Sequence, residues 1–161
     1  MTFYKSLVSA VLLSFAVLVA TSASVQAAEP INTLEKGLLF GYNESGTAIR
    51  GYDTVAYFTQ SKPVEGLDKY STEWKGATWK FSSQEHLDLF KNDPDKYAPQ
   101  YGGYCAYGVS QDALVKIEPE FWSIIDDKLY LNYDAGVQKT WESDISGYIS
   151  AADKKIDALL K

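Results

Sequence analysis

Two segments in the middle of the chain show the alternation of apolar and polar residues that is typical of half-buried β-strands. They are Lys69–Trp74 and Ala77–Ser82, and they flank Lys75-Gly76, which fits a two-residue hairpin turn. Every second position is mostly aromatic, so the sequence predicts a hairpin with one aromatic face.

This hairpin runs directly into a predicted helix over Ser83–Asn92. Ser82 and Glu85 have the spacing of a capping box, in which a hydroxyl and a carboxylate each satisfy an unpaired backbone donor. Asp93-Pro94 ends the helix, because proline lacks the amide proton and restricts the residue before it. Asp93 can also cap a short turn that follows.

Strand patterns occur on both sides of this unit. Thr54–Phe58 is rich in β-branched and aromatic residues and predicts a strand. Phe121–Ile125 and Lys128–Tyr133 flank Asp126-Asp127 and predict a second hairpin.

The chain ends in helical patterns. Asp134 stands where it can cap one helix, and from Asp144 onward the apolar residues trace a single face to the C-terminus. The elements together predict an α+β fold: a small antiparallel sheet of two hairpins, packed helices and a C-terminal amphipathic helix. The sequence shows no internal repeat.

The first 27 residues have the pattern of a secretory signal peptide. Lys5 precedes the mostly apolar run Leu7–Ala20, and small or polar residues follow up to a predicted cut between Ala27 and Ala28. The apolar run is too short for a comfortable membrane span. We therefore expect a periplasmic or secreted protein with no membrane span in the mature chain, an N-terminal arm over 28–47 and one domain over 48–161.

The net charge and the distribution of basic residues argue against one class of partner, nucleic acid. Loss of residues 1–27 removes one basic residue, so the mature chain has 14 basic and 21 acidic residues, a formal charge of −7. Its basic residues are not clustered, and a nucleic-acid-binding surface is therefore not supported.

Cys105 and His86 are the only cysteine and the only histidine of the chain. A single cysteine in an exported protein indicates a metal ligand, a reactive thiol or a bond to another chain, and the alternative is a packed apolar side chain. The only methionine, Met1, leaves with the signal peptide. A site for a soft metal must therefore use Cys105, His86, oxygen donors, backbone groups or a second chain.

Six segments, in their order along the chain, carry a resemblance to a known family. They are Gly51–Phe58, Trp79–Ser83, Phe90, Asp93–Tyr97, Tyr101–Tyr107 and Lys128–Tyr133. A glycine-turned hairpin, an aromatic strand ending in serine, a helix and a closing phenylalanine–acid–proline–tyrosine pattern resemble the YHS domain. The flanking segments are similar to the exported single-domain branch of that family.

The resemblance implies metal binding, because the YHS family is associated with metal handling and related domains occur beside heavy-metal transporters. Metal-binding members tend to place cysteines around the hairpin and at the helix start, where this chain has Ser82, Ser83 and His86. We therefore expect a transition metal, copper ahead of structural zinc, with Cys105, His86 and Asp53 as its candidate ligands. The expected role is storage, delivery or sensing, with a second copy or a metal-transport protein as partner.

Other interpretations of these residues stay open. Cys105 and His86 would suit a thiol–imidazole dyad for nucleophilic chemistry if they met in space. Asp53 is interpreted more simply as a turn or capping residue than as a ligand. The alternative function is a non-metal interaction or small-ligand-binding module in which Cys105 is packed or redox-active.

Overall fold

Short helices and antiparallel hairpins make up residues 28–36 and 42–161, the part of the chain that the computed structural model describes. In chain order the elements are β1 (Leu34–Lys36), β2 (Tyr42–Glu44), the 3-10 turn η1 (Ala48–Gly51), α1 (Thr54–Gln60), β3 (Leu67–Trp74), β4 (Ala77–Phe81), α2 (Gln84–Asn92), α3 (Pro94–Tyr97), the 3-10 turn η2 (Gln100–Gly103), α4 (Ala106–Ser110), β5 (Trp122–Ile125), β6 (Lys128–Leu131), α5 (Ala135–Ser143), α6 (Ile145–Asp153) and α7 (Ile156–Leu159). The predicted signal peptide, its cut after Ala27 and segment 37–41 of the predicted arm lie outside the described residues. Among the helices of the described ranges, none has the length and hydrophobicity to cross a membrane.

The α+β fold is confirmed, and both predicted hairpins are present. β3 pairs with β4 around Lys75-Gly76, and β5 pairs with β6 around Asp126-Asp127. The hairpins, with β1–β2, remain separate two-stranded sheets instead of joining into one. Ala77, Trp79 and Phe81 on β4 are all buried, which confirms the aromatic face.

The prediction of a strand at Thr54–Phe58 is wrong, because this segment lies in helix α1. The Asp53 carboxylate accepts hydrogen bonds from the backbone amides of Val55 and Ala56, which have no partner inside the helix. A short run of apolar residues fits a buried strand and a buried helix equally well, and here the cap decides for the helix.

The predicted caps are right at two helices, α3 and α5, and the predicted cap of α2 is displaced by one residue. Asp93, Asp134 and Asp144 cap α3, α5 and α6 with their side chains. At α2 the cap is Ser83, which accepts from the backbone amide of His86. The predicted capping residue Ser82 lies one position earlier, and its side chain contacts Asp53 instead.

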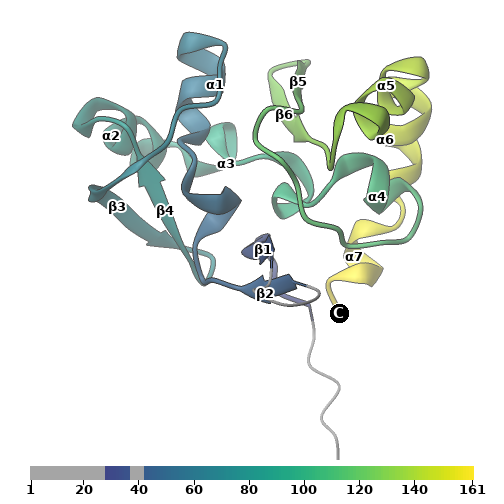
Figure 1. Ribbon diagram of the computed structural model, residues 1–161, viewed down its shortest axis with the longest axis horizontal. Helices are drawn as coiled ribbons and strands as arrows, with labels where there is room; N and C mark the ends of the chain where they lie inside the picture. The colour runs from purple at the N-terminus through teal and green to yellow at the C-terminus, as the bar shows by residue number, and fades with distance from the viewer. Residues whose placement is uncertain (1–27, 37–41) are drawn as a thin grey trace, which may run out of the picture.

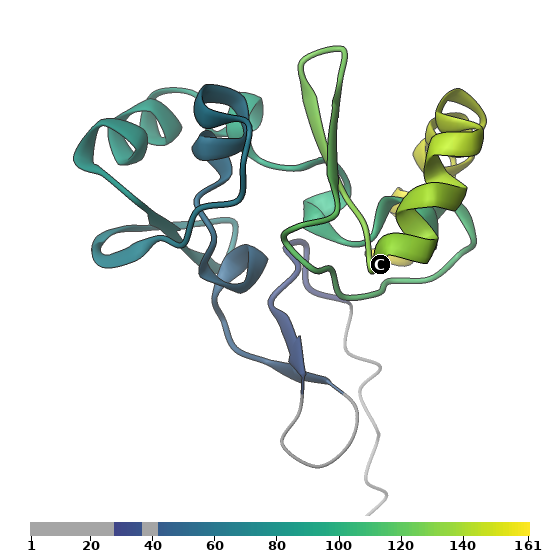
Figure 2. The same cartoon turned by 45° about the horizontal axis from the view of Figure 1, so that its top comes forward.

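Between β2 and α7, the described chain consists of two halves that repeat one order of elements: a 3-10 turn, a helix, a hairpin and two helices. The first half contains η1, α1, β3, β4, α2 and α3, and the second contains η2, α4, β5, β6, α5 and α6. Figures 1 and 2 show them side by side, the first in blue and teal and the second in green and yellow. This repeat is absent from the sequence-based expectations.

Backbone geometry supports the equivalence of the two halves. Each begins with three successive residues at positive φ, which end in Gly51 (φ 80°) and Gly103 (φ 82°). In each half the helix after the hairpin has nine residues and ends at an aspartate, Asp93 (φ −148°, ψ 74°) or Asp144 (φ −157°, ψ 64°). Equivalent residues are therefore 51 or 52 positions apart.

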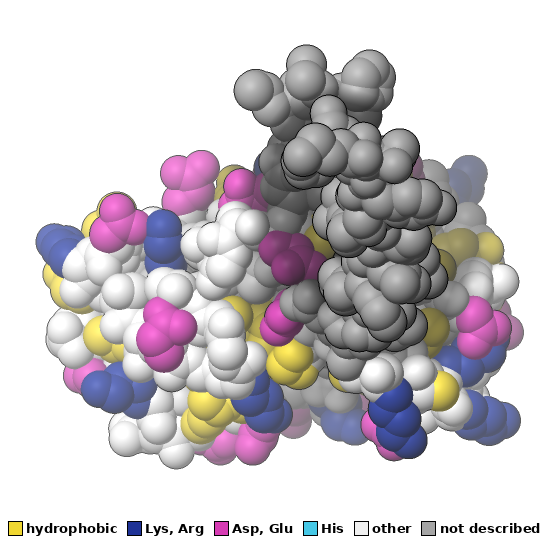
Figure 3. All heavy atoms as spheres, turned by 90° about the horizontal axis from the view of Figure 1, so that it is seen from below, with side chains coloured by type: hydrophobic (Ala, Val, Ile, Leu, Met, Phe, Trp, Pro, Cys, Tyr) yellow, Lys and Arg dark blue, Asp and Glu magenta, His cyan; other side chains and the backbone are white. Residues whose placement is uncertain are grey.

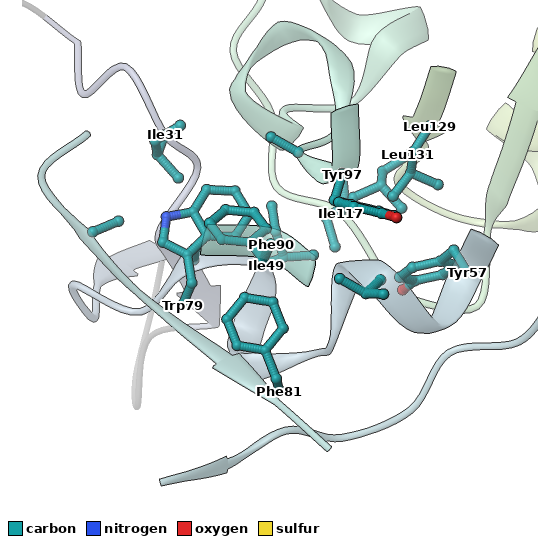
Figure 4. Packing of buried hydrophobic residues seen from close by; sticks show 14 of the residues in the cluster. Ile31, Ile49, Tyr57, Trp79, Phe81, Phe90, Tyr97, Ile117, Leu129 and Leu131 are labelled. Atoms are coloured by element: carbon teal, nitrogen blue, oxygen red, sulfur yellow. The ribbon is translucent and has the colours of Figure 1, made fainter. Parts of the chain in front are cut away.

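The aromatic pairs of the two cores follow the same spacing. Trp79 stacks on Phe90 with ring centroids 4.9 Å apart, and their equivalents Tyr130 and Trp141 lie 5.4 Å apart. Figure 4 shows Trp79 and Phe90 packed beside Ile49, in a cluster that extends to Leu129 and Leu131 of the second half. This cluster thus spans both halves, whereas Tyr130 and Trp141 belong to a second cluster. Burial of the large side chains of the first cluster stabilises the halves as a unit.

Residues 29–33, which we call the strap, belong to the predicted N-terminal arm and pack between the halves. The backbone amide and the side-chain amide of Asn32 donate to the carbonyls of Gly102 and Gly103, at 2.8 and 2.9 Å. The Asn32 carbonyl accepts from Ile49 at 3.2 Å. One buried residue, through its backbone and its side chain, therefore links the left-handed turns that open both halves.

Candidate functional site

Asp53 lies at the start of α1, and its side chain is fully buried. Oδ1 accepts from the backbone amides of Val55 and Ala56, at 3.0 and 3.2 Å. Oδ2 accepts from the backbone amide and the hydroxyl of Ser82, at 2.8 and 2.6 Å, and contacts the His86 ring. Five donors thus surround one carboxylate, which is how a buried charge is stabilised in a folded protein.

His86 joins this carboxylate from the first turn of α2, where the Ser83 cap holds its backbone. Its Nδ1 lies 2.6 Å from Oδ2 of Asp53, and its Nε2 lies 3.2 Å from Oγ1 of Thr59. The residue is 7% exposed. Thr59 is exposed on α1, so it stands between the imidazole and the solvent.

The Asp53–His86 contact fixes which ring nitrogen is available. When Nδ1 carries a proton and donates it to the carboxylate, Nε2 of the neutral imidazole holds a lone pair. Metal-binding imidazoles usually donate their other N–H to a carboxylate, a backbone carbonyl or a water molecule, which sets the tautomer and orientation of the ring. The lone pair is directed toward Thr59, whose single hydroxyl proton has two acceptors within reach, Nε2 and the Val55 carbonyl at 3.1 Å.

Cys105 occupies a different environment, at the start of α4, and is 1% exposed. Its Sγ accepts from the backbone amide of Gly108 at 3.4 Å and donates to Oδ1 of Asn132 at 3.6 Å. Burial raises the pKa of the Cys105 thiol, because an apolar surrounding disfavours the thiolate. The sulfur is therefore held as a neutral thiol.

Of the three candidate ligands, the structure brings Asp53 and His86 together and places Cys105 apart from them. α2 and α4 lie in different halves of the molecule in both ribbon views (Figures 1 and 2). The hydrogen-bond partners of His86 are Asp53, Thr59 and the serines around its cap, and those of the Cys105 sulfur are Gly108 and Asn132. Within the described ranges, no three residues among histidine, cysteine, aspartate and glutamate form a group that could hold a metal ion.

Two residues of the Asp53–His86 site were not among the predicted site residues: Thr59 and, as a partner of Asp53, Ser82. The sequence offers only a weak signal for Ser82, a hydroxyl directly after a strand that ends in a buried aromatic residue. Thr59 has no signal of its own, because a threonine at the end of an apolar helix is ordinary.

A pocket of about 290 Å³ opens beside Cys105. Tyr107, Val115, Tyr133 and Val137 form most of its wall, and these side chains pack against the main core. Its composition is mostly apolar with a few polar groups, which is typical of small-molecule sites, and its volume lies just below their usual range.

Charge is mixed on one face of the molecule. On the face in Figure 3, lysine and arginine side chains are interspersed with aspartate and glutamate. The polar contacts of the Asp53–His86 site lie in the interior, because both residues are buried.

Comparison with known proteins agrees with the sequence resemblance. The family model of the YHS domain matches residues 55–101, from α1 to the η2 turn. This family is associated with metal binding. No curated protein and no solved structure matches the chain. Residues 55–101, which run from α1 to the start of the second half, therefore match the YHS domain.

Proposed function

We propose that this protein is a periplasmic metal-binding protein that carries copper as exchangeable cargo, for storage, delivery or sensing. Three things support the proposal. The first 27 residues have the pattern of an export signal. The YHS family is associated with metal binding. The chain's one imidazole is also oriented by a buried carboxylate.

The observation that carries the proposal is the 2.6 Å contact between Nδ1 of His86 and Oδ2 of Asp53. It leaves Nε2 as the donor atom for a metal ion. Asp53 is a positioning residue in this proposal and not a ligand, because both of its oxygens already accept hydrogen bonds from buried donors. A metal ion at Asp53 would leave several of those donors without a partner, at about 1–3 kcal/mol each.

The donor set fits cargo better than a resident ion. One imidazole nitrogen, with the Thr59 hydroxyl as its neighbour, is too few ligands for a closed structural site of the zinc type. A single nitrogen from one chain, completed by water or by His86 of a second copy, would hold an ion that exchanges readily. Storage and delivery require that behaviour.

Copper is the metal that this site favours. Among divalent first-row ions, copper(II) binds most strongly to a given nitrogen and oxygen site, and imidazole is a suitable ligand for it. Copper(I) prefers thiolate and thioether sulfur. The mature chain has no methionine, and Cys105 lies in the other half.

A copper(II) titration of the mature protein, monitored by electron paramagnetic resonance, tests the proposal. We expect about one bound copper for every one or two chains, with nitrogen hyperfine coupling that disappears in His86→Asn. The matched control is Cys105→Ser, which should bind like the wild type. If Cys105→Ser loses copper while His86→Asn keeps it, Cys105 is the ligand and the proposal fails.

A second candidate function is a small-ligand-binding module, and one observation favours it. The pocket beside Cys105 has an apolar wall and a neutral thiol, and neither is suited to a divalent ion. This candidate does not depend on copper, because its pocket and the Asp53–His86 site lie in different halves of the chain.

A further inference from the structure

The pocket beside Cys105 lies where the second half lacks a counterpart of the His86 ring. With equivalent residues 51 or 52 positions apart, Val137 corresponds to His86. The three side chains whose atoms contact the imidazole ring also have counterparts: Cys105 for Asp53, Gln111 for Thr59 and Tyr133 for Ser82.

All four counterparts line the pocket of about 290 Å³. The counterparts therefore surround a space that is filled by an aromatic ring in the first half. The side chain of Val137 ends at its two methyl groups. The rest of the space that the His86 ring fills in the first half is therefore not filled in the second half.

Hydrogen bonds at the base of the two sites confirm the correspondence. In the first half the backbone amide of Ala56 donates to Asp53, and in the second the amide of Gly108, 52 positions later, donates to Cys105. Likewise Asp53 donates its amide to the Val64 carbonyl, as Cys105 does to the Val115 carbonyl.

The chemistry of the two sites differs at this base. Asp53 presents a charged carboxylate to its ring, whereas Cys105 presents a neutral thiol whose hydrogen is directed to Asn132. Aromatic side chains of Tyr107 and Tyr133 form part of the wall, and the exposed Gln111 supplies a carboxamide at the mouth. A cation would meet no negative charge among these lining residues, so an uncharged ring is favoured.

We propose that this pocket binds a small, neutral, planar heteroaromatic molecule, a single or fused azole ring, which lies where the imidazole of His86 lies in the first half. The ring stacks against the tyrosines and exchanges a hydrogen bond with Gln111. This inference rests on the second candidate function and names its class of ligand.

Titration with benzimidazole tests the inference, on metal-free mature protein with chelator present and with amide NMR signals as the readout. We expect saturable shifts confined to the neighbourhood of Cys105, Gln111, Tyr133 and Val137, with a dissociation constant on the order of 1 mM. Absence of saturable shifts at these residues would overturn the inference.

Two variants test whether benzimidazole binds in this pocket. Val137→His restores a ring at the equivalent position and should weaken benzimidazole binding at least about tenfold by competition for the same space. Val137→Phe fills the space with an uncharged ring and serves the same purpose if the histidine variant does not fold. Unchanged affinity in a folded variant would show that benzimidazole binds elsewhere.

A second ligand tests the chemical class. Cyclohexanol has a similar bulk to a single ring but is neither planar nor aromatic, so it should bind clearly more weakly than benzimidazole. Equal affinity would overturn the assignment to heteroaromatic rings. Because no copper is present, these outcomes are independent of whether His86 binds metal.

Discussion

Asp53 and Cys105 occupy equivalent positions in the two halves of the chain. Each follows a Gly-Tyr pair at the end of a left-handed turn, and each caps the helix that follows with its side chain. The two residues are related by the internal repeat, so they belong to two separate sites. One site holds an imidazole against a carboxylate, and the other leaves a pocket beside a thiol.

The buried carboxylate of Asp53 should be important for stability. In Asp53→Asn, the new amide group would face buried donors, and at least one donor on Ser82 or His86 would lose its acceptor. We expect the free energy of unfolding to fall by about 3 kcal/mol. Urea denaturation monitored by tryptophan fluorescence measures this change.

Asp134→Asn is the matched control for that variant. Asp134 caps α5 through one hydrogen bond to the Val137 amide, and asparagine caps a helix as well as aspartate does. Its cost should stay below about 0.5 kcal/mol. Equal costs for the two variants would show that the additional donors around Asp53 contribute nothing.

Local rules predicted much of the fold. A two-residue turn between alternating segments sufficed for both hairpins, and Asp93 and Asp134 were identified as helix caps from their positions. The strand prediction for Thr54–Phe58 failed because a run of four apolar residues after Thr54 carries no periodicity that separates strand from helix. The position of Asp53 directly before this segment was the signal that favoured a helix.

The repeat and the site geometry were beyond a single sequence. The halves share backbone conformation, but residue types differ at many equivalent positions: Phe90 corresponds to Trp141, and His86 to Val137. The contact between Asp53 and His86 joins residues 33 positions apart. Such a pairing depends on how α1 and α2 pack and has no local signal.

The close approach of the strap to the η2 turn should make Gly102 intolerant of any side chain. A Cβ atom at Gly102 would lie 2.1 Å from the carbonyl oxygen of Pro30, and the residue has a φ of +64°. We expect Gly102→Ala to destabilise the protein by about 3 kcal/mol, because the strap must move. Thermal unfolding of the variant gives the change.

Gly76→Ala separates the backbone contribution from the steric one. Gly76 also has a positive φ, +80°, but a Cβ there meets no atom within 4 Å. This variant should cost only about 1 kcal/mol, the usual penalty for alanine in the left-handed region. A Gly102→Ala variant as stable as Gly76→Ala would mean that the strap is not held against the turn.

Stability should fall at alkaline pH. Burial raises the pKa of the Cys105 thiol above its ordinary value near 9. Burial, with the charges of Glu44 and Glu29, raises the pKa of Tyr104 to about 12. Burial also raises the pKa of Tyr57. The unfolded chain loses these protons at lower pH than the native chain does, so their contribution is complete below about pH 9 and is lost progressively above it.

Urea unfolding at pH 8 and pH 10.5 measures this loss. Each group that is ionised only in the unfolded state lowers the free energy of unfolding by about 1.4 kcal/mol per pH unit. In Cys105→Ser the onset should move from about pH 9 to about pH 10, where unfolded tyrosines begin to ionise. Equal stability of the wild type at both pH values would contradict the prediction.

Removal of the Thr59 hydroxyl should strengthen copper binding at His86. Oγ1 of Thr59 lies 3.2 Å from Nε2, so a metal ion must displace this contact before it binds. In Thr59→Ala the lone pair is already free, and one hydrogen bond of about 1 kcal/mol corresponds to about a fivefold gain in copper(II) affinity.

Thr140→Ala is the control, because its hydroxyl makes the same contact to the carbonyl four residues earlier, that of Gly136, with no histidine beside it. Competition against a chelator of known affinity measures both variants. A lower copper affinity in Thr59→Ala would identify Thr59 as a ligand. A copper affinity equal to that of the control would show that copper does not bind at Nε2.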